Sequence, residues 1–367
     1  MAVLKMKSLE LSLILINKMK KNYIFIICLF LLSVSCSKVE RYDDAELFDF
    51  DTFVKIEELK GRMLEFDSMI MRPNGIRVYD SLLVLIEPRS EKLVHVFNLN
   101  TRKKIGSALS FGQGPDDMLQ PKLMTNGSHT FQLFDRSSSR IFEYDMATFL
   151  ESQNPKPMRR LKLSVPVFIS AEQVGDCIWG YSHQVEHQLY VFDSGDGEKT
   201  GEIIGYPNNN ISYTDTEKLD AYYMNFISNG MNKFAICYCM TDLIEFYDFN
   251  GNLHKRIHGP EQFFAHFKEY HDGKVISSSP DRETTRDAYF SPCNAGDCLM
   301  VMYDGGYVND PDHTGLCSWI FSFSWNGVPN IAYKLDNPLL FMTVDSQHRK
   351  IYGISNAPEY HIVEYSY

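Results

Sequence analysis

The chain has 367 residues and a formal net charge of −11, with 44% hydrophobic and 13% aromatic residues. An acidic surface repels phosphate backbones, so we expect no nucleic-acid partner. The Tyr and Phe residues lie in short alternating runs, which is typical of β-sheets.

The N-terminal segment has the pattern of a bacterial export signal. Lys18, Lys20 and Lys21 precede the apolar stretch Tyr23–Val34, whose 12 residues are too few to span a bilayer comfortably. Ser33–Cys36 follows, and small residues before a cysteine suit a lipoprotein signal peptidase. This segment resembles the bacterial lipobox. It predicts cleavage after residue 35 and lipidation, such as palmitate, at Cys36.

Two features complicate this signal. Ser33 stands where the lipobox prefers an aliphatic residue, so an ordinary signal peptide or an uncleaved anchor is the alternative. Met19 opens the sequence MKKNYIF, which reads as a natural start and suggests that translation begins there. We expect a mature protein in the cell envelope, held through Cys36 to a bacterial membrane, most simply the outer membrane.

The predicted domains are a signal peptide at 1–35, a lipidated tether at 36–51 and a globular domain at 52–367. Residues 1–35 carry five lysines and one glutamate, so their removal takes the net charge from −11 to −15. The mature chain of 332 residues is long enough for one large all-β domain.

A short pattern of alternating apolar residues, ending in Asp, Asn or Ser, recurs six times. The copies are Val94–Asn98, Ile141–Asp145, Leu189–Asp193, Ile244–Asp248, Ile320–Ser324 and Ile362–Ser366. Their final residues are 47, 48, 55, 76 and 42 positions apart, and four of these intervals are close to the length of one propeller blade. The longest interval, of 76 positions, implies insertions, which we place at 266–286 and 305–316.

Each copy lies among other predicted strands, which together give a four-stranded antiparallel unit. The sixth unit ends at Tyr367 without an outer strand, whereas the strand Thr52–Leu59 has no unit of its own. Docking Thr52–Leu59 beside Ile362–Tyr365 would close the ring and remove an open edge. The sequence therefore predicts an all-β, six-bladed β-propeller closed by an N-terminal strand. A two-sheet sandwich or two domains is the rival, but no linker-like stretch divides the chain.

Two turns carry a family resemblance. Phe111–Met118 (FGQGPDDM) resembles the GxGPxE-type turn of the TolB-like six-bladed β-propeller lipoproteins of Gram-negative bacteria, and Gly259–Phe263 is a degenerate second copy. Asp116 and Asp117 depart from the usual Gly-Glu. The resemblance covers about Thr52–Tyr367 and implies the propeller fold. It brings no catalytic residues and no cofactor.

Six cysteines follow Cys36, and an exported chain meets oxidising conditions. Cys293 and Cys298 flank a short polar turn and are the best candidates for a disulfide. A structural zinc site is the alternative for the CxC and Cx4C pairs, but no His or Cys accompanies either at suitable spacing. We therefore expect no metal.

Two further patterns resemble metal motifs. His183–His187 (HQVEH) matches the HxxEH protease pattern, but it lies between two strands, where the required helix is absent. The loop Asp304–His313 also contains Asp310 and Asp312. It is interpreted as a solvated acidic loop, with a cation site as the alternative because its spacing is not that of an EF-hand.

Two classes of function fit this chain: a non-catalytic propeller that binds an unknown protein or glycan ligand, and a hydrolase or lyase acting on a glycan or peptide. Propeller loops on one face converge on a central funnel, where ligands usually bind. The polar candidates for that face are Arg89, Arg136, His183, His187, Asp304 and Tyr360. Two carboxylates, or a histidine with a carboxylate, converging there would favour an enzyme.

Overall fold

The computed structural model describes residues 40–124, 130–152, 154–167, 169–182 and 186–367. Contacts divide the chain into two units, one of residues 1–41 with 209–211 and the other of residues 42–208 with 212–367. All of the described strands belong to the second unit. The predicted signal peptide, Cys36 and His183 lie outside the described residues.

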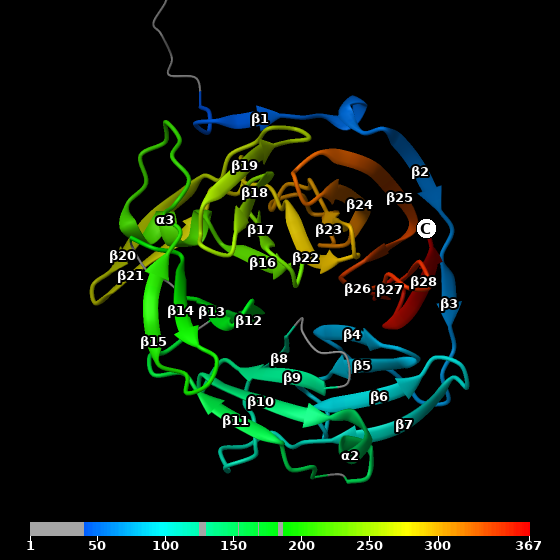
Figure 1. The fold of residues 1–367 in the computed structure, drawn as a ribbon. Helices are drawn as coiled ribbons and strands as arrows, with labels where there is room; N and C mark the ends of the chain where they lie inside the picture. Colours follow the sequence, from blue (N-terminus) through cyan, green and yellow to red (C-terminus); the bar gives the residue numbers. More distant parts are fainter. Residues whose placement is uncertain (1–39, 125–129, 153, 168, 183–185) are drawn as a thin grey trace, which may run out of the picture. The chain divides into compact units, whose positions relative to one another are not determined.

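The second unit is a ring of six antiparallel blades (Figure 1), which confirms the predicted six-bladed β-propeller. Each blade runs from the central strand outward, and the first comprises β4 (Gly75–Tyr79), β5 (Leu82–Ile86), β6 (Val94–Asn98) and β7 (Lys103–Ala108). The second blade comprises β8 (Pro121–Leu123), β9 (Thr130–Asp135), β10 (Arg140–Asp145) and β11 (Arg159–Lys162). The third blade comprises β12 (Ser170–Val174), β13 (Cys177–Tyr181), β14 (Leu189–Asp193) and β15 (Lys199–Ile203).

Blades four to six follow the same order. The fourth blade comprises β16 (Met224–Ser228), β17 (Lys233–Tyr238), β18 (Leu243–Asp248) and β19 (Leu253–His258). The fifth comprises β22 (Tyr289–Asn294), β23 (Cys298–Tyr303), β24 (Cys317–Ser324) and β25 (Pro329–Leu339). The sixth comprises β26 (Phe341–Asp345), β27 (Lys350–Ser355) and β28 (His361–Ser366). The fourth strand of the sixth blade comes from the N-terminal segment.

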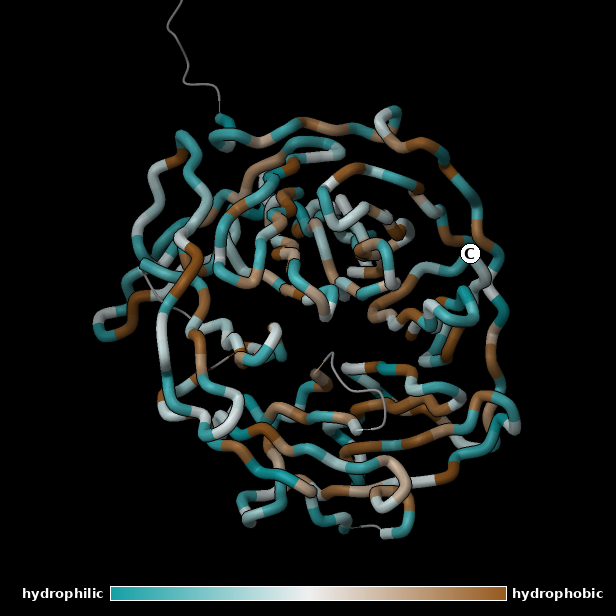
Figure 2. The backbone as a smooth tube through the Cα atoms, in the orientation of Figure 1, coloured by the Kyte–Doolittle hydropathy of each residue, from teal (hydrophilic) through white to brown (hydrophobic). Residues whose placement is uncertain are grey.

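The core lies between the blades. In the described residues the buried apolar side chains form six clusters, and each cluster joins two neighbouring blades. The second strand of a blade is packed on both faces, so β5 reads as the continuous apolar run LLVLI instead of alternating. The outer strand β7 alternates exposed and covered residues. Figure 2 shows the same division, with apolar colour in the strands and mostly hydrophilic turns.

The N-terminal segment runs along the outside of three blades (Figure 1). β1 (Ala45–Leu47) pairs in parallel with β19, and β2 (Lys55–Leu59) pairs in parallel with β25. β3 (Arg62–Leu64) pairs antiparallel with β28 and completes the sixth blade. We call residues 42–64 the N-terminal belt. It covers strand edges that would otherwise present unpaired backbone groups.

The belt confirms closure by an N-terminal strand, but the strand assigned to that role was wrong. Thr52–Leu59 does not lie beside Ile362–Tyr365, because its strand β2 covers the edge of the 11-residue β25 in the fifth blade. The strand that closes the ring is β3, Arg62–Leu64, which begins three residues after Leu59. The ordered belt also begins inside the segment predicted as a tether, because Tyr42 is buried, stacks on Phe264 and donates a hydrogen bond to Thr241 Oγ1.

A buried carboxylate marks the closing strand pair. Glu364 of β28 accepts a hydrogen bond from Arg62 of β3 at 2.7 Å, and Lys350 Nζ lies 3.3 Å from the same carboxylate oxygen. Burial alone would raise the pKa of Glu364, but Arg62 and Lys350 outweigh it and hold that pKa below its usual value. The ionised pair therefore stabilises the join between the two ends of the domain.

Both predicted insertions lie where the spacing placed them. Residues 266–286 contain the hairpin β20 (Phe267–Asp272) and β21 (Val275–Pro280), which contacts the short helix α3 (Asp215–Ala221). Residues 305–316 form the long connection between β23 and β24. None of the described helices is long and apolar enough to cross a membrane.

The belt gives a direct stability test. Phe53 is 6% exposed and packs against Phe48, Phe321 and Phe323, whereas its neighbour Val54 is 83% exposed. We expect Phe53→Ala to lower the free energy of unfolding by about 3 kcal/mol, and Val54→Ala to change it little. Urea unfolding of both variants measures this. Equal effects of the two substitutions would show that the belt does not pack on the fifth blade.

Candidate functional site

One face of the ring collects the connections that the sequence assigned to the funnel. In the second blade, Asp135 at the end of β9 pairs with Arg140 at the start of β10 and with Pro121 at the start of β8. The turn between the second and third strands thus lies beside the chain entering the blade. We call this end of the blades the funnel face.

Buried carboxylates fix the connections on the funnel face. Asp242 is fully buried, and it accepts hydrogen bonds from the backbone N–H groups of Glu261, Gln262 and Phe263. Asp135 likewise accepts hydrogen bonds from the backbone N–H groups of Leu119 and Gln120. Because these carboxylates are satisfied by backbone groups, they hold the incoming chain in place and are not available as ligand-binding groups.

The six sequence candidates are placed differently. Arg89 is exposed in the turn after β5, and Arg136 is half-buried in the turn after β9. His187 Nδ1 lies 3.5 Å from Glu202 of the outer strand β15, and Tyr360 packs in the apolar cluster between the sixth and first blades. Asp304 lies in a cluster with two other ionisable residues, Asp287 and His313.

Charged side chains from several blades influence one another near the centre of the ring. The pKa of Lys122, on the innermost strand β8, is lowered mainly by burial. Smaller effects come from Glu172 of β12, Arg136, Cys239 and Arg77 of β4. Groups on four blades can act on one ammonium only where the inner strands converge. In the described part of the chain, Lys122 Nζ and the buried Nε of Arg77 donate no hydrogen bond.

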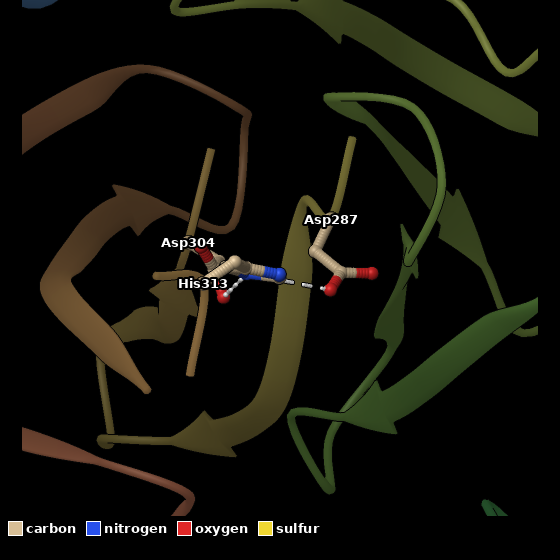
Figure 3. Close-up of side chains that lie close together, drawn as sticks. All are labelled: Asp287, Asp304 and His313. Atoms are coloured by element: carbon tan, nitrogen blue, oxygen red, sulfur yellow. Dashed lines mark hydrogen bonds and ion pairs between the residues drawn. The ribbon is translucent and has the colours of Figure 1, made fainter. Parts of the chain in front are cut away.

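The fifth blade contributes a cluster of different chemistry (Figure 3). Asp287 lies two residues before the start of β22, Asp304 follows β23, and His313 lies in the connection to β24. His313 Nε2 is 3.0 Å from Asp304 Oδ2 and 3.6 Å from Asp287 Oδ2. One ligand atom from each residue lies within 4.8 Å of the others. We call these three residues the Asp–Asp–His cluster.

Backbone contacts hold the cluster together. Asp287 N donates to Gly306 O and Gly305 N donates to Asp287 O, both at 2.9 Å, so the two connections pair like strands. Gly306 N donates to Asp304 Oδ1 at 2.9 Å. A Cβ atom at Gly306 would lie 2.5 Å from His313 Cδ2 and 2.8 Å from Asp304 Oδ1. Glycine at this position therefore lets the imidazole approach the carboxylates.

The cluster is partly buried and has excess negative charge. Burial, and to a smaller extent the nearby Asp304 charge, raise the pKa of Asp287 to about 6, although His313 partly opposes them. Burial lowers the pKa of His313, but Asp304 and Asp287 outweigh it, so that pKa is raised. The cluster can therefore hold a proton between its members, or a cation in place of that proton.

The nearest arginine does not neutralise these carboxylates. Arg286 donates from Nε to Gly305 O at 2.7 Å and forms an ion pair with Glu261, while its guanidinium lies over the rings of Phe263 and Tyr307. Tyr303 also donates to Glu261, at 2.7 Å. Arg286 therefore holds Gly305 and Glu261 together beside the cluster.

The two cysteines predicted to pair are free thiols in the structure. Cys293 lies opposite Met300, two residues beyond Cys298, and Cys298 lies opposite Ser324. Diagonal neighbours of this kind are roughly 7–8 Å apart, beyond the usual reach of a disulfide. Burial raises the pKa of each thiol to about 11, which makes both poor nucleophiles.

Sequence reasoning identified Asp304 and considered His313, but it missed Asp287. Asp287 lies just before an innermost strand, and the insertion 266–286 ends beside it. A polar residue where the chain enters a blade on the funnel face is a usable signal. The contact with Asp304 across the backbone pairing was not visible in the sequence.

Comparisons with known proteins agree with the fold. Residues 51–347 match the model of a family described as TolB-like 6-blade propeller-like. A solved structure of a DUF4221 family member from Bacteroides vulgatus has a TM-score of 0.54 and 9% identity, covering 85% of this chain and 96% of that one. A Bacteroides fragilis protein described as exported has a TM-score of 0.51 and 11% identity, covering 88% and 98%. No curated protein matches the sequence.

Proposed function

Because the chain belongs to the TolB-like six-bladed propeller family, we propose that it is a lipid-anchored envelope protein whose propeller binds a protein or glycan ligand at the funnel face without transforming it. The observation that carries the binding function is the meeting of charged side chains from several blades where the inner strands converge. Fold alone does not select a function, so the proposal depends on this site.

Anchoring is supported by the sequence before the propeller. A basic segment, a 12-residue apolar stretch and Cys36 lie in the order that export and diacylation require. The Bacteroides fragilis relative in fold is described as exported, which agrees with this location.

The chemistry of these inner-strand residues favours an anionic group on the ligand. Lys122 and Arg77 have buried or half-buried donors without hydrogen-bond partners among the described residues, and Arg136 also acts on Lys122. An unpaired cationic donor is costly to bury, so a carboxylate offers it a strong partner. A peptide side chain or an acidic sugar both supply that group.

A hydrolase or lyase acting on a glycan or peptide is the second candidate. The observation that favours it is the Asp–Asp–His cluster, where a histidine and a carboxylate converge within hydrogen-bonding distance. The pKa of Asp287, raised to about 6, suits a general acid or base near neutral pH.

The anchor is tested by Cys36→Ala. We expect this substitution to abolish incorporation of labelled fatty acid, because the thiol is the acylated group, and to leave the precursor uncleaved. Labelling in cells followed by immunoprecipitation measures both. Cys28→Ala, inside the apolar stretch, is the matched control and should label normally. Labelling of Cys36→Ala at the wild-type level would refute lipidation at this residue.

Ligand binding is tested by Lys122→Met with Lys103→Met as control, since Lys103 is exposed on the outer strand β7. Oligogalacturonate and an oligoglutamate peptide serve as carboxylate probes, with neutral counterparts, in fluorescence polarisation. We expect one carboxylate probe to bind to the wild-type chain. Lys122→Met should weaken the binding of that probe about tenfold or more, and Lys103→Met should have no effect. No binding, or equal loss in both variants, contradicts the proposal. Cleavage of a probe, seen by mass spectrometry, favours the enzyme.

A further inference from the structure

We propose that Asp287, Asp304 and His313 form a binding site for a divalent transition-metal ion such as Zn²⁺ or Mn²⁺. This inference goes beyond the ligand-binding function. It depends only on the geometry and charge of the cluster, so it holds whatever ligand binds at the funnel face and however the protein is anchored.

The spacing of the donor atoms suits a metal ion. Ligands bound about 2.1 Å from an ion at adjacent positions are roughly 3.0–3.5 Å apart. The His313 Nε2 atom is 3.0 Å from Asp304 Oδ2 and 3.6 Å from Asp287 Oδ2. The side chains reach this spacing from two separate connections and point toward one another (Figure 3). Little rearrangement is therefore needed for all three to bind one ion.

The charge balance also favours a cation. Among the described residues, neither Asp287 nor Asp304 forms an ion pair with a lysine or arginine, and the Asp287 carboxylate accepts no hydrogen bond. Arg286, the adjacent cation, is paired with Glu261 instead. The side chains of Asp287, Asp304 and His313 are only 19%, 6% and 14% exposed, so water screens their charges weakly.

The donor set indicates which metals fit. Calcium and magnesium prefer oxygen ligands alone, whereas an imidazole with carboxylates suits zinc, manganese or iron. Three protein ligands leave at least one position open, as in metal sites that bind water or a ligand group. A metal here would hold the connection 305–316 against the start of β22, and its open position would face the funnel.

The groups that contact the three side chains support the same arrangement. Gly306 N donates to Asp304 Oδ1, which leaves the other oxygen, Oδ2, directed at His313. Gly306 also provides the space that the imidazole occupies. Hydrogen bonds that orient a carboxylate in this way are typical of metal ligands.

The test is calorimetric titration of the full mature chain in detergent, after removal of metals with EDTA, with ZnCl₂, MnCl₂ and CaCl₂. We expect one equivalent of Zn²⁺ or Mn²⁺ to bind and CaCl₂ to bind at least about tenfold more weakly. Asp304→Asn and His313→Gln should each weaken transition-metal binding by at least about tenfold. Asp312→Asn, exposed in the same loop, and His271→Gln, on the hairpin β20–β21, should not.

Electron paramagnetic resonance of bound Mn²⁺ gives a second readout for variants that are less stable. Loss of ¹⁴N coupling in His313→Gln, with the coupling kept in His271→Gln, would place the imidazole on the metal. The proposal is overturned if the wild-type chain binds neither metal at 1 mM, or if the cluster variants bind as tightly as the two control variants.

Discussion

The pairing of Arg62–Leu64 with Ile362–Glu364 is the interaction on which this structure depends. Every apolar cluster lies between two blades, so a ring that opened between the sixth and first blades would expose the cluster between them. The closing strand β3 has three residues, and the buried Glu364 with Arg62 reinforces it. The belt residues before β3 extend that closure along the fifth and fourth blades.

The belt also reaches the funnel face. Phe48 N donates to His258 O, and a Cβ atom at Gly259 would lie 2.1 Å from Phe48 O. His258 in turn lies 3.0 Å from Asp242, which holds the backbone of residues 261–263. Tyr289, which lies two residues after Asp287, donates a hydrogen bond to Gly259 O. A continuous set of contacts therefore links the closing segment to the start of β22, where the Asp–Asp–His cluster lies.

Much of the fold could be predicted from local sequence pattern. The six copies of the alternating pattern all lie on the third strands, each of which ends in Asp, Asn or Ser as the pattern does. The belt was harder to predict, because β1 and β2 pair in parallel with strands that are distant in the sequence. Such parallel pairing leaves no hairpin signal in the sequence. Thr52–Leu59 alternates as a strand should, but alternation does not say which blade it joins.

The candidate site was less predictable. Asp304 was selected from its position in a turn, whereas His187 occupies an equivalent turn and faces the outer strand. The direction of a turn side chain depends on backbone geometry that the sequence pattern does not encode. Asp287 joins the cluster through a pairing between two irregular connections, which no periodicity reports.

Ring closure is tested most directly by native-state hydrogen exchange of the backbone amides in β3 and β28. If β3 closes the ring, the Met63 and Leu64 region should exchange only through the same large-scale opening that exposes β27 and β28. Its opening free energy should then match theirs across a series of denaturant concentrations. Exchange of the β3 amides at unprotected rates, while β27 and β28 stay protected, would contradict closure by this strand.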